Sequence, residues 1–351
     1  MKEQIKISYN KEGLEGLSAL LNKQGYSSIF ILVDTNTKTY CLKRFISITN
    51  LQNATVLTMD AGEQNKNLMT CEALWNELSS LGADRNSVLI NLGGGVVTDL
   101  GGFVACTFKR GIDFFNIPTT LLSMVDASVG GKTGIDLGPL KNQIGIIQEP
   151  KQVIVDSDWL NTLPNNEIRS GFAEMLKHGL IAKPRYWKTL KTLKELKPSV
   201  LAKYIISSIK VKSKVVLEDP REKGLRKILN YGHTLGHAIE SYFLITPSKN
   251  RLLHGEAIAI GMILEAYLSI HCSGLNSKEA DDIKATFTSY YGVVNITKEE
   301  QHKILALLCH DKKNKAGRIN FVLLKAIGTP DIDVEVPQEL FSKAFEYYAA
   351  T

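Results

Sequence analysis

The sequence lacks the features that set secreted, membrane and disulfide-rich proteins apart. Its 351 residues include only five Cys, which are widely spaced and form no CxxC pair, so neither a disulfide framework nor a thiolate metal site is indicated. No uninterrupted apolar run approaches the roughly 18 residues needed to cross a membrane. The first residues, MKEQIKISYNKEG, contain no apolar signal segment. We therefore expect a cytoplasmic protein that does not contact membranes.

The sequence also has only a small excess of positive over negative charge. The net charge is +6, with 44% hydrophobic and 22% charged residues, as in globular chains long enough for two domains. The basic excess gathers between 183 and 214, where ten Lys or Arg face one acidic residue, Glu195. Basic residues interleaved with apolar ones at helical spacing are typical of a solvated helix face, so we expect no nucleic-acid partner. The same balance suits a small anionic substrate.

Short apolar, β-branched runs alternate with helical patterns in the first half of the chain. The runs 28–33, 54–59 and 88–92 are separated by segments of helical periodicity such as 69–81. This alternation predicts a parallel sheet covered on both faces. Ligands of such sheets bind at the carboxyl ends of the strands.

Two features lie at those predicted strand ends. Asp34 directly follows the first run, where a carboxylate can accept hydrogen bonds from a ribose. The run SVLINL leads into Gly93-Gly94-Gly95 and then into an apolar helical segment, which would bring backbone N–H groups close to a pyrophosphate. Thr98 stands where GxGxxG requires its third Gly, so a purely structural glycine turn is the alternative.

The stretch Gly130-Gly131-Lys132-Thr133 ends like a phosphate-binding P-loop. That motif requires Gly at position 126, where this chain has Asp126. No apolar strand runs into the stretch either, and a nucleotide kinase is therefore excluded.

Helical patterns dominate from about residue 161. The predicted helices cover 167–181, 186–217, 228–243, 255–269 and 278–290, with Pro residues between them. We therefore predict an α/β nucleotide-binding domain with a parallel sheet over 1–160, and a mainly α-helical domain over 161–351.

The segment 226–262 concentrates groups that can carry chemistry. Arg226, Asn230, His233, His237 and Glu240 mostly fall three or four residues apart, a spacing that places side chains on one face of a helix. A single His on such a face is usually a core residue, but several His beside an Arg, an Asn and carboxylates favour a functional site.

Three of the chain's seven His residues lie in this segment, and together they predict a metal site. His233 and His237, at i and i+4, could both bind one ion, and His254 could supply a third ligand. A catalytic zinc-like ion takes three such protein ligands and keeps one position open. The metalloprotease motif HExxH needs Glu after the first His, where this chain has Thr234. The sequence therefore does not favour a metalloprotease.

A series of motifs gives these features a common explanation. They are GGGVVTDLGGFVA (93–105), KRG (109–111), IPTTLLSMVDASVGGKTGID (117–136), KNQIG (141–145), SGFAEMLKHG (170–179), RKILNYGHTLGHAIE (226–240), LLHGEAIAIGM (252–262) and DKK (311–313). In these motifs the chain resembles the 3-dehydroquinate synthases, sugar-phosphate cyclases of the shikimate pathway, over nearly its whole length. The resemblance implies a nucleotide-binding α/β domain followed by a helical metal-binding domain.

The resemblance also implies roles for individual residues. The metal ligands, for Zn2+ or Co2+, would be Glu174, His233 and His254, which leaves His237 as a catalytic hydrogen-bonding or proton-transfer group. The residues implied to bind NAD are Asp34, Glu63, Lys66, Gly94, Gly95, Val96, Asp99, Thr119, Thr120, Lys132, Lys141 and Thr162. The residues implied to grip the substrate are Asp126, Lys132, Asn142, Lys177, Lys212, Arg226, Asn230 and, from the DKK segment, Lys312. Arg110 resembles a family residue that reaches the phosphate across a homodimer interface.

The implied activity is that of a carbon–oxygen lyase. It converts 3-deoxy-D-arabino-heptulosonate 7-phosphate to 3-dehydroquinate and phosphate by transient oxidation with NAD, phosphate elimination, re-reduction and intramolecular aldol cyclisation. Several cations suit a substrate that carries a carboxylate and a phosphate. The chain departs from the family pattern at Ala61, where an acidic residue is common, and at Leu235, which replaces an aromatic residue.

Three alternatives remain at this stage. A related sugar-phosphate cyclase would share the metal ligands and differ in its substrate-facing groups. A metal-dependent polyol dehydrogenase would use similar domains but release NADH. A non-enzymatic basic protein would bind nucleic acid in a salt-sensitive way.

Overall fold

The computed structural model describes residues 6–138, 140–246, 249–308 and 319–350, and the chain divides into two compact units. Unit 1 comprises Met1–Ile168 and Lys197–Ser213, and unit 2 comprises Arg169–Leu196 and Lys214–Thr351. The division falls inside two long helices, α6 (Asn165–Ala182) and α8 (Pro198–Glu218). The segment 197–213, which the sequence analysis placed with the helical half, is therefore part of unit 1.

A six-stranded sheet forms the centre of unit 1. Its strands are β1 (Ile7–Tyr9), β2 (Ile29–Asp34), β3 (Thr55–Met59), β4 (Val88–Gly93), β5 (Asp113–Pro118) and β8 (Gln152–Val155). All neighbouring pairs are parallel, in the order β1-β8-β5-β4-β2-β3. The chain passes outward from β2 to β3 and then returns to the other side of β2 to form β4. The strand order therefore reverses between β2 and β4, the place where open α/β sheets bind ligands.

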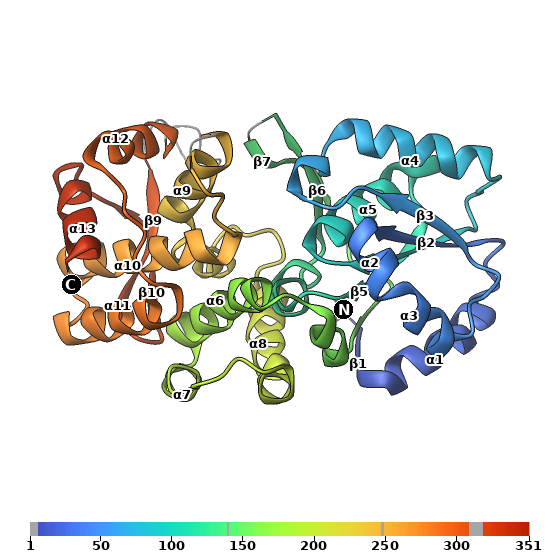
Figure 1. Ribbon diagram of the computed structural model, residues 1–351, viewed down its shortest axis with the longest axis horizontal. Helices are drawn as coiled ribbons and strands as arrows, with labels where there is room; N and C mark the ends of the chain where they lie inside the picture. The colour runs from blue at the N-terminus through green and yellow to red at the C-terminus, as the bar shows by residue number, and fades with distance from the viewer. Residues whose placement is uncertain (1–5, 139, 247–248, 309–318, 351) are drawn as a thin grey trace. The chain divides into compact units, whose positions relative to one another are not determined.

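Helices cover both faces of this sheet, which confirms the predicted α/β class. They are α1 (Asn10–Gln24), α2 (Thr35–Tyr40), α3 (Leu42–Thr49), α4 (Leu68–Ser80) and α5 (Gly95–Thr107). Figure 1 shows α4 and α5 on one side of the strands, and α1 and α3 on the other. β4 is buried along its whole length because it is central and covered on both faces.

An antiparallel hairpin, β6 (Lys132–Leu137) and β7 (Leu140–Ile147), completes unit 1. No pattern in the sequence predicted this hairpin. Gly134 and Gly145 are opposite each other, and a Cβ on either would overlap the backbone of the other strand. The two strands can therefore pair closely only with glycine at both positions.

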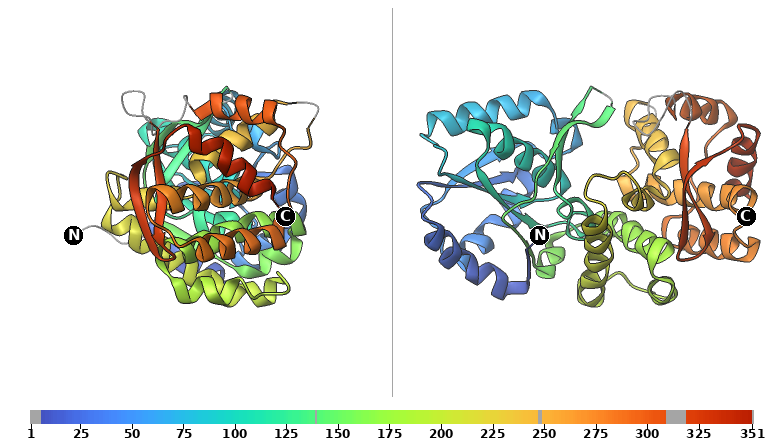
Figure 2. Two further views of the ribbon diagram at one scale, coloured as in Figure 1. Left: turned by 90° about the vertical axis from the view of Figure 1, so that its left-hand side faces the viewer. Right: turned by 180° about the vertical axis from the view of Figure 1, so that it is seen from behind.

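Unit 2 is mainly helical, as the sequence predicted. Besides the end of α6, it contains α7 (Pro184–Leu190), α9 (His233–Ile245), α10 (His254–Cys272), α11 (Ser277–Tyr291), α12 (Lys298–Leu307) and α13 (Glu339–Ala349). α10 is packed against α9, α11, α13 and the strand β9 (Asn320–Ala326), and Figure 2 shows these gold, orange and red elements together. Among the described helices, α10 alone is long and apolar enough to span a membrane, yet 72% of that window is buried inside the protein. This is the burial of a core helix.

Two of the predicted helices are wrong in their bounds. The segment 186–217 forms α7 and α8 with a break between them, because the residue before Pro198 is disfavoured in a helix. The segment 228–243 is also broken: a 3₁₀ helix, Leu225–Asn230, ends before Gly232, which has φ +80°, and α9 begins at His233. Arg226 and Asn230 therefore do not share one helix face with His233 and His237.

Unit 2 also contains a hairpin that the sequence analysis did not predict. It consists of β9 (Asn320–Ala326) and β10 (Thr329–Glu335), which pair antiparallel. The side chains of Phe321, Leu323 and Leu324 are almost fully buried. β9 thus adds apolar surface to the core around α10.

Candidate functional site

The candidate nucleotide residues of unit 1 follow the ends of adjacent strands. β2 ends at Asp34 and β4 at Gly93, on the two sides of the point where the strand order reverses. Thr119 follows the next strand, β5, and its N–H donates to the carbonyl of Gly93 over 3.0 Å. The structure therefore brings three separate predicted segments to one edge of the sheet.

The glycine turn after β4 has a steric reason for its composition. A Cβ on Gly93 would overlap Val97, and a Cβ on Gly94 would overlap Thr120. Gly94 is the N-cap of α5 and offers no side chain to cap it. The first N–H groups of α5 are thus presented by a turn without side chains, the arrangement that suits a phosphate at a helix N-terminus.

Asp34 has a structural role at the same edge. Its Oδ1 accepts hydrogen bonds from the N–H of Thr37 at 2.7 Å and from its hydroxyl at 2.9 Å, and so caps α2. The cap fixes the direction of the carboxylate at the end of β2.

A buried network of charges surrounds Lys66, whose side chain is only 4% exposed. Its Nζ donates to Asn142 Oδ1 at 2.6 Å and lies 3.3 Å from Asp99, 3.4 Å from Glu63 and 3.8 Å from Asp136. Burial alone would lower the pKa of Lys66, but the three carboxylates together raise it above its ordinary value. Lys66 therefore remains a cation in a buried position.

Asp99 responds to the same environment in the opposite sense. Burial raises the pKa of its carboxyl to about 6, against the attraction of Lys66. Glu63, which also pairs with Lys141 at 3.1 Å, raises this pKa further. Four predicted NAD residues, Glu63, Lys66, Asp99 and Lys141, thus form one electrostatic group.

Asn142 connects this group to the residues predicted for substrate. Its backbone has φ +52°, which is unfavourable for a residue other than glycine. The conformation is held because its N–H donates to Asp136 Oδ1 at 2.7 Å and its side chain accepts from Lys66. Burial raises the pKa of Asp136. Asp136 was not predicted, and no spacing in the sequence singles it out.

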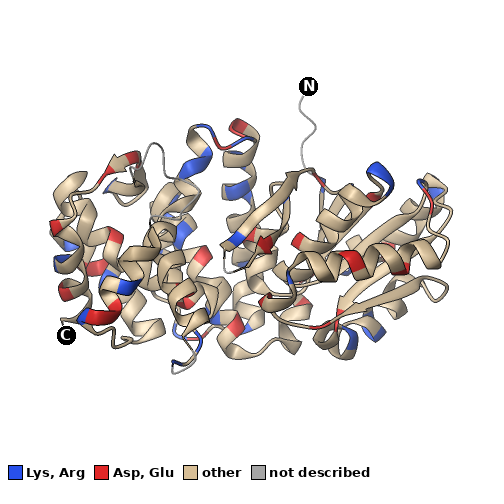
Figure 3. Ribbon diagram, turned by 90° about the horizontal axis from the view of Figure 1, so that it is seen from above, with Lys and Arg blue, Asp and Glu red and all other residues tan. Residues whose placement is uncertain are grey.

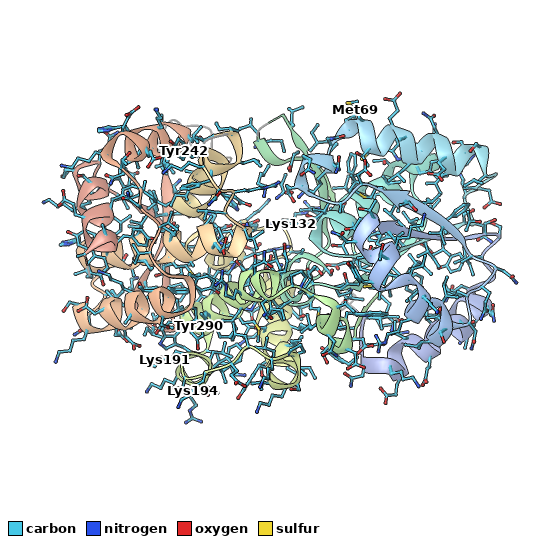
Figure 4. All side chains as sticks on the ribbon, in the orientation of Figure 1. Met69, Lys132, Lys191, Lys194, Tyr242 and Tyr290 are labelled. Carbon is cyan, nitrogen blue, oxygen red and sulfur yellow. The ribbon has the colours of Figure 1, made fainter. Side chains whose placement is uncertain are left out.

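The other candidate residues of unit 1 lie in several settings. Lys212, on α8, donates to Asp126 Oδ1 at 2.6 Å and to its carbonyl oxygen at 2.5 Å. Lys132, at the start of β6, is exposed (Figure 4). Arg110 is exposed with φ +72°, and Thr162 is exposed at the end of a 3₁₀ helix. Lys312 lies outside the described residues.

The candidate metal ligands of unit 2 come from three helices. Glu174 lies on α6, His233 is the first residue of α9, and His254 is the first residue of α10. Oε1 of Glu174 is 3.6 Å from Nε2 of His233 and 3.9 Å from Nε2 of His254. Two ligand atoms bound tetrahedrally to zinc at about 2.0–2.1 Å lie roughly 3.3–3.4 Å apart. Oε1 of Glu174 therefore needs only a small movement to share one ion with either imidazole.

The surroundings of Glu174 also fit a metal ligand. Glu174 is fully buried, and among the described residues its Oε1 has no hydrogen-bond partner. Lys177, one turn later on α6, forms an ion pair with the other carboxylate oxygen. A buried carboxylate oxygen without a donor is costly, and a cation would offset that cost.

The imidazoles of the two candidate ligands are oriented through their Nδ1 atoms. Nδ1 of His254 is 3.1 Å from Oε2 of Glu240, and Nδ1 of His233 is 3.2 Å from the carbonyl oxygen of Tyr231. Both partners accept hydrogen bonds, which favours a proton on Nδ1 and leaves Nε2 able to bind a metal. Glu240 is three residues after His237 on α9, so the helical spacing could have identified this role.

His237 lies beside the two candidate ligands His233 and His254. Its ring centroid is 5.0 Å from that of His233 and 5.8 Å from that of His254, and one nitrogen of each of the three rings lies within 4.8 Å of those of the others. The all-histidine ligand set is therefore also geometrically accessible. The buried carboxylate of Glu174 favours the set with Glu174 and leaves His237 adjacent to the ion.

Arg226 and Asn230 lie before the break that precedes α9. Arg226 is 2% exposed, and its Nη1 donates to the carbonyl of Pro220 at 2.8 Å. Asn230 donates to Oε1 of Glu222 at 2.6 Å. Both side chains are thus fixed by the loop that follows α8.

The sequence is similar to known proteins along nearly its whole length. The sequence profile described as "3-dehydroquinate synthase N-terminal" matches residues 56–170, and "3-dehydroquinate synthase C-terminal" matches 171–314. A curated 3-dehydroquinate synthase from Parabacteroides distasonis is 41% identical over 350 residues, which cover 99% of this chain and 98% of that protein.

Solved structures agree with this chain in fold. A 2-deoxy-scyllo-inosose synthase complexed with carbaglucose-6-phosphate, NAD+ and Co2+ aligns with a TM-score of 0.82 at 24% identity, covering 97% of this chain and 98% of that one. A 2-epi-5-epi-valiolone synthase from Streptomyces hygroscopicus with NAD+ and Zn2+ bound aligns with a TM-score of 0.84 at 22% identity, covering 99% and 98%. At these identities the likeness concerns the fold.

Proposed function

Because the chain belongs to the 3-dehydroquinate synthase family, we infer that it converts 3-deoxy-D-arabino-heptulosonate 7-phosphate to 3-dehydroquinate and phosphate. In reaction class this is a carbon–oxygen lyase that eliminates phosphate and closes a carbocycle. Identity of 41% over 99% of the chain supports this activity more than that of a related cyclase or a polyol dehydrogenase.

The convergence of Glu174, His233 and His254 in unit 2 carries this proposal. These residues would hold Zn2+ or Co2+, and histidine and carboxylate ligands tolerate both metals. When bound, the metal would polarise vicinal hydroxyls of the substrate, and NAD would take up and return a hydride. The overall reaction then involves no net oxidation.

Unit 1 would hold the NAD. Asp34 is placed to accept hydrogen bonds from a ribose, and the glycine turn offers the N-terminus of α5 to the pyrophosphate. The NAD-facing set comprises Asp34, Glu63, Lys66, Gly94, Gly95, Val96, Asp99, Thr119, Thr120, Lys132, Lys141 and Thr162. The ion pairs around Lys66 preorganise four members of this set, Glu63, Lys66, Asp99 and Lys141, because they fix these side chains against one another.

The residues proposed to face the substrate supply cations and a proton-transfer group. The cationic side chains of Lys132, Lys177, Lys212 and Arg226 suit a ligand with a carboxylate and a phosphate. Asp126, Asn142 and Asn230 would orient its hydroxyls, and Lys312 would add a further cation. His237, beside the ligand histidines, would donate or accept a proton at its imidazole during opening of the sugar ring and aldol closure.

We further propose a cytoplasmic homodimer in which Arg110 of a second copy reaches the phosphate. Figure 3 shows basic and acidic residues interspersed along the ribbon, and this mixed distribution supports a small anionic substrate more than a polyanion such as nucleic acid. Chemical crosslinking and mixing of an Arg110→Ala protein with a second inactive variant would test the shared site.

Phosphate release tests the activity directly. Purified protein with the heptulosonate phosphate should release one phosphate per turnover, lose activity with chelator, regain it with Zn2+ or Co2+, and accumulate no NADH at 340 nm. Steady growth of NADH with a polyol would instead identify a dehydrogenase. Turnover of a different sugar phosphate in preference to the heptulosonate would identify a related cyclase. Salt-sensitive nucleic-acid binding without turnover would contradict an enzymatic role.

A further inference from the structure

The helix that carries two of the three histidines has no cap of its own. α9 begins at His233, and its N-cap residue is Gly232, which has no side chain to accept a hydrogen bond from the first turn. The first N–H groups of any α-helix have no partner within the helix. At a buried helix start these groups need an acceptor from another part of the chain.

Glu265 of α10 supplies that acceptor. Its Oε2 accepts from the N–H of Gly232 at 2.6 Å, and its Oε1 accepts from the N–H of Leu235 at 3.2 Å. The side chain is 0% exposed. A buried carboxylate is stabilised by backbone donors and by the positive end of a helix, and Glu265 has both.

The packing of the two helices brings Glu265 within reach. Gly261, one turn before Glu265, contacts the backbone of Gly232 and Gly236, and a Cβ on Gly261 would overlap the carbonyl oxygen of Gly232. The hydroxyl of Tyr231 also donates to the carbonyl of Met262 at 3.0 Å. The segment 231–235 is therefore attached to α10 on both sides of His233.

We propose that Glu265 is a positioning residue for the metal site: by fixing the backbone on both sides of His233, it sets the direction in which Nε2 of His233 faces Glu174. The inference rests on the metal site of the proposed function. It differs from the role of Glu240, which contacts the ring of a ligand directly. Glu265 acts through the backbone, and an acidic residue in the middle of the apolar run AIAIGMILEAYL is its only signal in the sequence.

Glu265→Gln tests this role with little change in volume. The amide keeps one acceptor but turns an NH2 group toward one of the two backbone N–H donors. We expect the affinity for Co2+, measured by competition with a chromophoric chelator, to fall by about 10- to 100-fold. The visible absorption spectrum of bound Co2+ should change, because the position of one nitrogen ligand has changed.

Glu300→Gln is the matched control. Glu300 is 8% exposed and caps α12 through the N–H of Thr297 at 2.8 Å, and the hydroxyl of Tyr242 (Figure 4) donates to it at 3.3 Å. Glu300 also pairs with Lys249 at 2.8 Å. α12 carries no proposed ligand, and Tyr242 lies in the last turn of α9, after His233 and His237. This variant should lose thermal stability while its Co2+ affinity and spectrum stay those of the unaltered protein.

The outcomes separate the two proposals. Failure of the unaltered protein to bind Co2+ would count against the proposed function. Co2+ binding by Glu265→Gln with unchanged affinity and spectrum would overturn only the role of Glu265. Glu265→Asp, which keeps the charge but shortens the reach, should restore part of the lost affinity. If neither variant folds, Glu265 serves the folding of unit 2 as a whole and the positioning proposal is wrong.

Discussion

In unit 1 the candidate residues follow the ends of neighbouring parallel strands, whereas in unit 2 the three candidate metal ligands come from the beginnings or interiors of three separate helices. The strand ends of unit 1 meet at one edge by topology alone, and backbone turns such as Gly93–Gly95 form much of the candidate surface. The ligands of unit 2 meet only because α6, α9 and α10 pack together. Unit 1 should therefore tolerate single changes better than unit 2.

Removal of the buried candidate ligand Glu174 should have the largest effect on metal binding and turnover. Glu174→Ala should remove metal and reduce turnover by more than about 100-fold, the upper figure for losing an outer-shell partner. Elemental analysis and phosphate release measure the two effects. Glu299→Ala removes an exposed carboxylate and should change neither. A Glu174→Ala protein that kept both metal and turnover would refute the proposed ligand set.

Removal of the adjacent imidazole should separate metal binding from proton transfer. His237→Asn should keep the metal, because Glu174, His233 and His254 remain, while turnover falls by about 100- to 10,000-fold. Chelator competition and phosphate release give the comparison. A loss of metal as large as that of Glu174→Ala would show instead that His237 is a ligand.

A buried carboxyl in unit 1 should make stability depend on pH. Burial raises the pKa of Asp99 from 3.8 to about 6 in the folded protein. Between about pH 4 and pH 6 the folded state therefore binds more protons than the unfolded state. Over this range the contribution of Asp99 to the free energy of unfolding falls as the pH rises, and above about pH 6 this contribution stays constant. The full effect is about 3 kcal/mol.

Asp99→Asn should reduce this dependence, and the raised pKa of Asp136 accounts for a slope that remains. Urea unfolding of the protein without NAD, repeated across that pH range, measures the slope. Exposed Asp60 provides the control, since Asp60→Asn should keep the slope of the unaltered protein. An identical slope in all three proteins would show that Asp99 is not the group responsible.

The smallest expected effect concerns the residue that orients His254. Glu240→Gln replaces the carboxylate 3.1 Å from Nδ1 of His254 and should weaken metal binding by about 10-fold. Isothermal titration with Zn2+ measures the change. Unaltered affinity would mean that the helix start alone orients His254.

The sequence predicts three of the six strands in the sheet of unit 1 closely, for a physical reason. The runs 28–33, 54–59 and 88–92 became β2, β3 and β4 with bounds shifted by one residue at most, because alternating strands and helices leave few topologies. In unit 2, the apolar periodicity of the sequence continues across Tyr231 and Gly232. The helical pattern therefore does not predict the break before α9.

Sequence periodicity does not predict long-range contacts in either unit. Glu174 entered only through the resemblance, since a lone helix Glu is usually solvated. The buried partners Asp136 and Glu265 act on residues that are distant in sequence, Lys66 and Gly232. Glu240 is the exception, because the spacing His233, His237, Glu240 already places it on the ligand face of α9.

The glycine contacts between α9 and α10 have a consequence for heat resistance. At Gly232, Gly236 and Gly261 the two main chains come so close that a Cβ would overlap the facing segment. The separation of His233 from His254 is therefore set largely by planar peptide groups, which have no rotamers to change on warming. The pair of imidazoles should keep its spacing up to the temperature at which unit 2 unfolds.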